Sequence, residues 1–191
     1  MSLAQPKHYT AEDLDELQRD GKRHEIEKGV LIEIPHKGNR ISLIELETAC
    51  YLSDYSKENG ISGVVLPGSA RFRLQSSPDT VRGPDVSFIC GERLPDGIPD
   101  RVQDLVPDLV VEIVSKSNPA DEIETRIIDY LEAGTRLLWV IYPKSRSAYI
   151  YQSLDTVKRI DAGGVLEGGD VLPGFSLSLQ ELFAAAGPYK E

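Results

Sequence analysis

Cysteine, methionine and tryptophan are scarce in this chain of 191 residues, which holds two, one and one of them. Cys50 and Cys90 stand in apolar surroundings, TACYL and SFICG, so we expect two reduced core residues and disfavour a disulfide or a zinc site. No stretch approaches the roughly 18 uninterrupted apolar residues of a membrane span. The first residues lack the apolar core and cleavage site of a secretory signal, which favours a cytoplasmic protein.

Positive charge is also scarce. The chain has 21 Lys and Arg against 31 Asp and Glu, a formal net charge of −10, and no basic tail. This balance disfavours generic binding of a polyanion through a basic surface. A nucleic-acid contact would need a local patch, metal ions, or a dimer that gathers the few arginines.

The overall composition is that of a globular protein, with 40% hydrophobic and 27% charged residues. A chain of this length buries about 70% of the surface that its unfolded form exposes. It needs no disulfide or metal to fold, and it shows no internal repeat. We therefore expect a single domain over residues 1–191.

Helical and strand patterns alternate along the chain. Helices are expected at 10–21, from 39 to about 59, from 117 or 118 to 133, and from 178. Strands are expected at 24–28, 30–35, 64–66, 70–74, 85–90, 108–114, 137–142 and 147–151, and near 156–160 and 165–172. This order predicts an α/β or α+β fold with a mixed central sheet.

Glu112 interrupts an otherwise apolar strand, DLVVEIV. Strand alternation puts Leu109, Val111 and Ile113 on one face and Val110 and Glu112 on the other. Burying an unpaired carboxylate costs several kcal/mol, so Glu112 needs a partner or an ion. The alternatives are an arginine partner, or a place at the open end of the sheet.

Asp85 follows Gly83 and Pro84 and opens the strand DVSFIC. Taken alone, it is typical of a turn aspartate before a strand. If its strand neighbours that of Glu112, the two acids can converge on one point. Converging carboxylates at a sheet edge are what Mg²⁺ requires, and in hydrolysis that ion stabilises developing charge and acidifies water.

Several segments together resemble a known family, the Uma-type bacterial family of proposed restriction endonucleases within the PD-(D/E)XK nuclease-like superfamily. These segments are HEIEKGVLIEIP (24–35), GPDVSF (83–88), PDLVVEIVSKSN (107–118), RIIDYLEAGTRLLWVIYP (126–143) and LPGFSLSLQELF (172–183). The resemblance implies a restriction-endonuclease-like core of a mixed sheet flanked by helices. It also implies Mg²⁺, with Mn²⁺ as a substitute, held by Asp85 and Glu112. The implied activity is hydrolysis of DNA phosphodiester bonds, and by analogy a homodimer is plausible.

The sequence departs from the D/E-x-K motif, because Val114 stands two residues after Glu112. The family usually has its lysine in the next helix, where this chain has Arg126. A guanidinium can stabilise phosphate charge, but its pKa is too high for a base. Lys116 is a candidate substitute that would reach back from the loop, and the alternative is a solvated loop lysine.

Glu25 matches a glutamate of the family's first hairpin. It either completes the acidic cluster from the side or is an exposed strand residue paired with Lys28 or Arg23. No histidine role carries over. His36 lies near the second helix, where many members of the family have a histidine, and the histidines show no metal-ligand spacing.

Three functions remain open. The first is a metal-dependent endonuclease, in which Arg126 or Lys116 contacts the scissile phosphate. The second is a catalytically impaired nuclease-like module that binds nucleic acid or a protein partner. The third is a structural protein, in which replacing Glu112 would leave stability unchanged or raise it and metal would have no effect.

Overall fold

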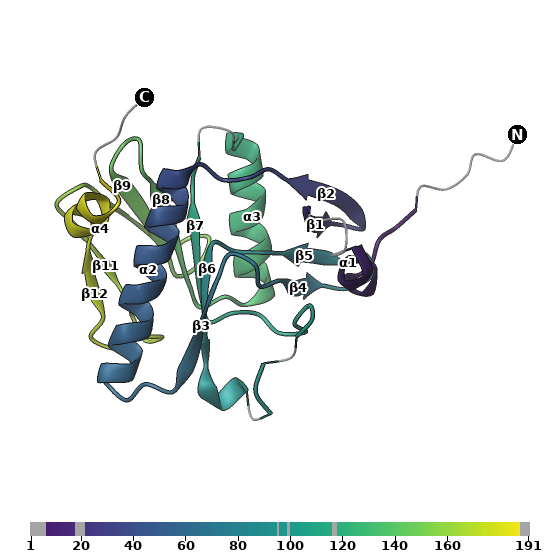
Figure 1. Cartoon of the computed structure of the whole chain (residues 1–191), viewed down its shortest axis with the longest axis horizontal. Helices are drawn as coiled ribbons and strands as arrows, with labels where there is room; N and C mark the ends of the chain where they lie inside the picture. Colours follow the sequence, from purple (N-terminus) through teal and green to yellow (C-terminus); the bar gives the residue numbers. More distant parts are fainter. Residues whose placement is uncertain (1–6, 18–21, 95, 99, 116–117, 188–191) are drawn as a thin grey trace, which may run out of the picture.

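The computed structural model describes residues 7–17, 22–94, 96–98, 100–115 and 118–187. Among these residues the strands form a six-stranded sheet, a four-stranded sheet and a two-stranded ribbon. The four-stranded sheet lies to one side of the six-stranded sheet, and the ribbon lies to the other (Figure 1).

The six-stranded sheet is mixed and has the order β10-β9-β8-β7-β6-β3. Strands β7 and β8 are parallel and connected through helix α3, and the other neighbours are antiparallel. Its strands are β3 (Gly63–Pro67), β6 (Val86–Cys90), β7 (Leu109–Ile113), β8 (Leu137–Tyr142), β9 (Ser147–Tyr151) and β10 (Val157–Ile160). The predicted mixed central sheet is confirmed.

Helices cover both faces of this sheet. Helices α2 (Asn39–Glu58) and α4 (Leu179–Ala185) pack on one face, in a core that includes Leu109, Val111 and Ile113. Helix α3 (Ala120–Ala133) packs on the other face, against Val110. The two faces of β7 predicted from strand alternation are therefore confirmed, and Glu112 lies on the α3 side.

The four-stranded antiparallel sheet has the order β2-β1-β5-β4 and packs against helix α1 through Leu14, Ile26 and Val81. Its elements are α1 (Ala11–Leu17), β1 (Arg23–Glu27), β2 (Val30–Ile34), β4 (Phe72–Gln75) and β5 (Thr80–Arg82). The first hairpin is tight, with positive φ at Lys28 and Gly29, as its two-residue turn requires. Strand β5 corrects the prediction that the whole segment QSSPDTVRGP is a turn, because three fully buried residues pair there between turn-forming neighbours.

The short remaining elements are η2 (Gly91–Arg93), β11 (Val165–Glu167) and β12 (Ser176–Ser178). The expected strand at 165–172 ends early, at Glu167, because a turn follows. Helix α4 begins as predicted, with the Glu181 amide donating to the Ser178 hydroxyl at 3.4 Å. The expected end of the first helix, at residues 18–21, lies outside the described residues. None of the helices in the described part of the chain is long and apolar enough to cross a membrane.

The buried stripe of α2 differs from the expected one. Ile41, Ile44 and Leu52 are buried as predicted, whereas Leu46 is 55% exposed and Cys50 is also exposed. Residues three or four apart share a helix face, so the stripe continues through Thr48, while Leu46 and Cys50 fall on the opposite side. The prediction that Cys50 is a core residue is wrong. Both cysteines are free.

Candidate functional site

The two predicted acids meet where strand β6 begins and strand β7 ends. Asp85 directly precedes β6, and its amide donates to the Val111 carbonyl at 3.1 Å. The Ile113 amide donates to Asp85 Oδ2 at 2.8 Å. These bonds fix the Asp85 carboxylate beside the end of β7, one residue from Glu112. Both carboxylates line the same pocket of about 70 Å³ and are 4% and 5% exposed as residues.

Arg126 reaches the same pocket from helix α3. Its Nε and Nη2 donate to Glu112 Oε1 at 3.2 and 2.8 Å. Its Nη1 and Nη2 donate to the two carboxylate oxygens of Glu25 at 2.5 and 3.1 Å. The guanidinium is buried, and besides these two acids it donates only weakly to the Gly83 carbonyl, at 3.4 Å. It is therefore placed to hold carboxylates, which differs from the predicted contact with a scissile phosphate.

Glu25, on strand β1, is 2% exposed. The exposed pairing with Lys28 or Arg23, one of the two alternatives, is wrong. Its partners are Arg126, Arg82 at 3.3 Å and the Gly83 amide at 2.9 Å. Burial pushes the pKa of Glu25 upward, but these positive partners outweigh it and hold the pKa below its usual value.

Arg82 links this cluster to its surroundings. It also binds Glu27 and Asp129, each at 2.6 Å from Nη2. This role was not predicted, because Arg82 lies in the segment expected to be a turn. Its pairing with Asp129 on α3 depends on tertiary contacts.

Glu112 has the opposite electrostatic balance. Burial and the nearby negative charge of Asp85 raise its pKa to about 7, although Arg126 opposes them. Behind it, the Tyr130 hydroxyl is buried and has no hydrogen-bond partner among the described residues. Burial and the charge of Glu112 hold the pKa of Tyr130 well above its usual value. The pocket therefore favours added positive charge.

Lys37 already brings one positive charge to this place. It lies in the connection between β2 and α2, and its ammonium group contacts Asp85 Oδ1 and binds Glu45 Oε2 at 2.8 Å. Its side chain is 15% exposed. Sequence reasoning missed Lys37. The only available signal was its position, just after the matched hairpin segment and two residues before the second helix.

The remaining candidates divide as follows. Lys116 lies outside the described residues. His36 lines the pocket of the two acids. Among the described residues, no group of three or more His, Cys, Asp and Glu is arranged to hold a metal ion. Two carboxylates still fit Mg²⁺, which proteins commonly hold with one or two carboxylates, with water and substrate phosphate completing the shell.

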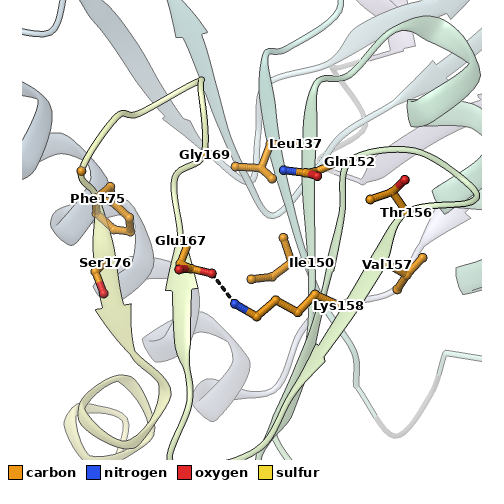
Figure 2. A pocket seen from close by; sticks show the side chains of 11 residues that line it. Leu137, Ile150, Gln152, Thr156, Val157, Lys158, Glu167, Gly169, Phe175 and Ser176 are labelled. Atoms are coloured by element: carbon orange, nitrogen blue, oxygen red, sulfur yellow. Dashed lines mark hydrogen bonds and ion pairs between the residues drawn. The ribbon is translucent and has the colours of Figure 1, made fainter.

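A larger cavity, of about 530 Å³, lies between β9–β10 and the β11–β12 ribbon (Figure 2). Its lining includes the apolar side chains of Leu137, Ile150 and Phe175, and an ion pair joins Lys158 and Glu167 (Figure 2). None of the predicted site residues lines it. Its lining mixes these apolar side chains with polar ones such as Gln152, Thr156 and Ser176.

The fold defines the class of protein. The structure resembles the crystal structure of a "putative nuclease belonging to DUF820" from Anabaena variabilis, with a TM-score of 0.77. The two chains are 20% identical, and the match covers 91% of this chain and 98% of the other. The two proteins therefore share one fold, a mixed sheet flanked by helices.

The sequence gives the family. The Uma2 family, described as "Putative restriction endonuclease", matches residues 11–180. The chain belongs to this family, which confirms the resemblance recognised in its motifs. Comparison with curated proteins found no match.

Proposed function

We propose that the chain is a metal-dependent endonuclease that hydrolyses DNA phosphodiester bonds. The observation that carries the proposal is the meeting of Asp85 and Glu112 in one pocket at the end of β7. Membership of the family described as restriction endonucleases supports the reaction class. Asp85 and Glu112 would hold Mg²⁺, with Mn²⁺ as a substitute.

A bound Mg²⁺ supplies stabilisation of charge on phosphoryl oxygens and lowers the pKa of water. The protein groups position and balance the site. Arg126 fixes Glu112 against Glu25 through its planar donors, so that the Glu112 carboxylate keeps one orientation. The buried surroundings limit competing water and strengthen each electrostatic contact.

Lys37 is the cation best suited to meet the scissile phosphate. Both cations line the pocket and each pairs with two carboxylates, but the side chain of Lys37 is 15% exposed against 7% for Arg126. An ammonium on a flexible stem can turn from Asp85 to a phosphoryl oxygen when a metal ion takes its place. In this proposal Lys37 contacts the phosphate and Arg126 acts as a positioning residue.

The first experiment is a calorimetric Mn²⁺ titration of the wild type beside Glu112→Gln. We expect binding by the wild type and a loss of at least tenfold in affinity in the variant, because one of two anionic ligands is removed. Glu167→Gln, which changes an exposed ion-paired glutamate on β11, is the matched control and should bind as the wild type does. Equal Mn²⁺ binding by wild type and Glu112→Gln would refute the assignment.

Cleavage of DNA is the second readout. We expect Mg²⁺-dependent cleavage by the wild type, none by Glu112→Gln, and a large loss in Lys37→Met. A wild type that binds Mn²⁺ but cuts no DNA would favour the second candidate, an impaired module that binds nucleic acid or a protein. The observation that favours this candidate is Arg126, which stands at the family's lysine position and is occupied by Glu25 and Glu112.

A further inference from the structure

A second cavity adjoins the pocket of the acid pair. It measures about 310 Å³, and the two share Arg23, Glu25, Ile34 and Gly83 as lining residues. A ligand extending from the acid pair past Gly83 would therefore enter this second cavity.

The second cavity is rich in positive charge, in a chain whose net charge is −10. Its charged lining consists of three basic side chains, Lys22, Arg23 and Arg71, and two acidic ones, Glu25 and Asp100. Lys22 pairs with Glu33, outside the cavity lining. Of the two acids, Glu25 is already bound by Arg126 and Arg82. The cavity is thus a local basic patch. An acidic chain needs such a patch if it is to contact nucleic acid.

Among the described residues, the two arginines in this cavity pair with carboxylates weakly or not at all. Arg23 donates to the neutral carbonyl of Gly68, and no carboxylate among the described residues pairs with it. The closest acid of Arg71 is Asp15, at 3.7 Å, and its guanidinium also donates weakly to a backbone carbonyl at 3.5 Å. Burial and the positive charge of Arg23 lower the pKa of Arg71, with Asp15 opposing. The two guanidinium groups repel each other, and an anion between them would remove that cost.

The backbone connects this pair to the acid pair. Gly68, whose carbonyl accepts from Arg23, donates its own amide to the Asp85 carbonyl at 2.8 Å. Arg23 is therefore held two hydrogen bonds away from one of the proposed metal ligands. A phosphate at Arg23 and Arg71 and a phosphate at Asp85 can belong to the same nucleic-acid strand.

The geometry points to a subsite at Arg23 and Arg71 for a non-scissile backbone phosphate of a DNA strand. Guanidinium groups suit this role because their planar donors match phosphate oxygens. The inference rests on the proposed function and adds the path of the strand beyond the cleaved bond. It assigns no base recognition, because backbone contacts carry no direct sequence information.

The test measures binding of a labelled DNA duplex by fluorescence anisotropy, in EDTA, over a range of salt concentrations. The slope of log K against log salt should become shallower by about 0.9 in Arg23→Gln/Arg71→Gln, which is the change expected for one lost phosphate contact. Arg23→Lys/Arg71→Lys keeps the charge and should keep most of the slope. Arg159→Gln, an exposed arginine paired with Asp161 on the edge strand β10, is the matched control and should leave the slope unchanged.

Several results would overturn the inference. An unchanged slope and affinity in the folded Gln variant would do so, as would a wild type without affinity for DNA. If the Gln variant does not fold, the single variants Arg23→Gln and Arg71→Gln replace it, and each should lower both slope and affinity. Inorganic phosphate tests whether the two arginines form a site for a free anion instead. If phosphate stabilises the wild type but not the Gln variant, while the salt dependence of DNA binding is the same in both, the backbone subsite is contradicted.

This experiment separates the two proposals. It needs neither metal nor cleavage and leaves Asp85 and Glu112 intact. Arginine-dependent DNA binding without cleavage in Mg²⁺ or Mn²⁺ would refute the endonuclease and retain the subsite. Cleavage of DNA, with a salt slope that is the same in the wild type and the Gln variant, would retain the endonuclease and refute the subsite.

Discussion

At the scale of single residues, Arg126 balances two buried carboxylates. Glu25 and Glu112 belong to different sheets, and the guanidinium of Arg126 binds both from helix α3. A buried ion cluster of this kind adds little net stability when complete, since desolvation offsets the attraction. Removing its central cation is costly, because it leaves buried charges without compensation.

We therefore predict that Arg126→Met lowers the free energy of unfolding by about 3–5 kcal/mol. Arg126→Lys should lose less, since it keeps the charge but not the paired geometry. Chemical denaturation at neutral pH measures both. Arg159→Met changes an arginine whose side chain is 50% exposed and should cost under about 0.5 kcal/mol. A loss in Arg126→Met as small as in this control would show that the cluster is not coupled to folding.

Glu112 leads to a prediction about pH. Its pKa is raised to about 7 from the ordinary 4.5 by burial and by Asp85 and Glu25, against Arg126. Between these values the native state holds a proton that the unfolded chain has lost, so stability falls as pH rises through this window. Glu25 has a lowered pKa, so its contribution to the stability of the folded protein is lost only at a pH below this window. The charge of Tyr130 changes only at higher pH, since its pKa is raised from the ordinary 10.0.

The measurement is the free energy of unfolding in EDTA from about pH 5 to about pH 8. The wild type should lose stability across this range relative to Glu112→Gln, which cannot titrate at that position. Glu167→Gln should follow the wild type. Parallel curves for the wild type and Glu112→Gln would mean that Glu112 stays ionised in the folded protein.

Part of the candidate site could be predicted residue by residue. Asp85 and Glu112 stand out locally, as acids at the start and in the middle of apolar strands. Lys37 and Arg82 do not, because their roles depend on which segments fold against them. An arginine partner for Glu112 was one of the alternatives that the sequence left open, and Arg126 is that partner. Its second acid was not foreseen, since Glu25 is 101 residues away along the chain.

At the scale of elements, strand patterns were more informative than helix patterns. The buried runs of β7 and β8 were both predicted as strands from their apolar content. For β7 the two faces were predicted as well, because strand alternation has a period of two. Strand β5 was missed because it has only three residues between turn-forming neighbours. In α2 the apolar residues outnumber the positions that face the core, so the sequence did not identify the buried stripe.

Two leucines of α2 test this stripe. Leu52 is fully buried and Leu46 is 55% exposed. Leu52→Ala should cost about 2–5 kcal/mol of unfolding free energy, because it removes core packing and leaves a cavity. Leu46→Ala should change it by less than about 0.5 kcal/mol. Denaturation with urea compares them directly, and a larger loss in Leu46→Ala would mean that its face is covered in solution.

At the scale of the whole molecule, the negative net charge opposes binding of DNA. The chain carries −10 overall, yet basic side chains gather in the cavity beside the acid pair. Approach to DNA is then governed by two opposing effects, long-range repulsion by the whole chain and short-range attraction at the cavity. Salt separates them, because the Debye length falls from about 30 Å at 0.01 M to about 8 Å at physiological ionic strength.

Removing acidic side chains outside the proposed DNA-binding cavity should therefore speed DNA association only at low salt. Asp155, between β9 and β10, and Asp170, after β11, are exposed. We predict that Asp155→Asn/Asp170→Asn raises the association rate a few-fold at about 10 mM salt and leaves it unchanged at about 150 mM. Stopped-flow fluorescence with labelled DNA in EDTA measures both rates. A gain that persists at the higher salt would mean that these acids lie at the DNA contact itself, which would move the binding surface to the β10 edge and away from the acid pair.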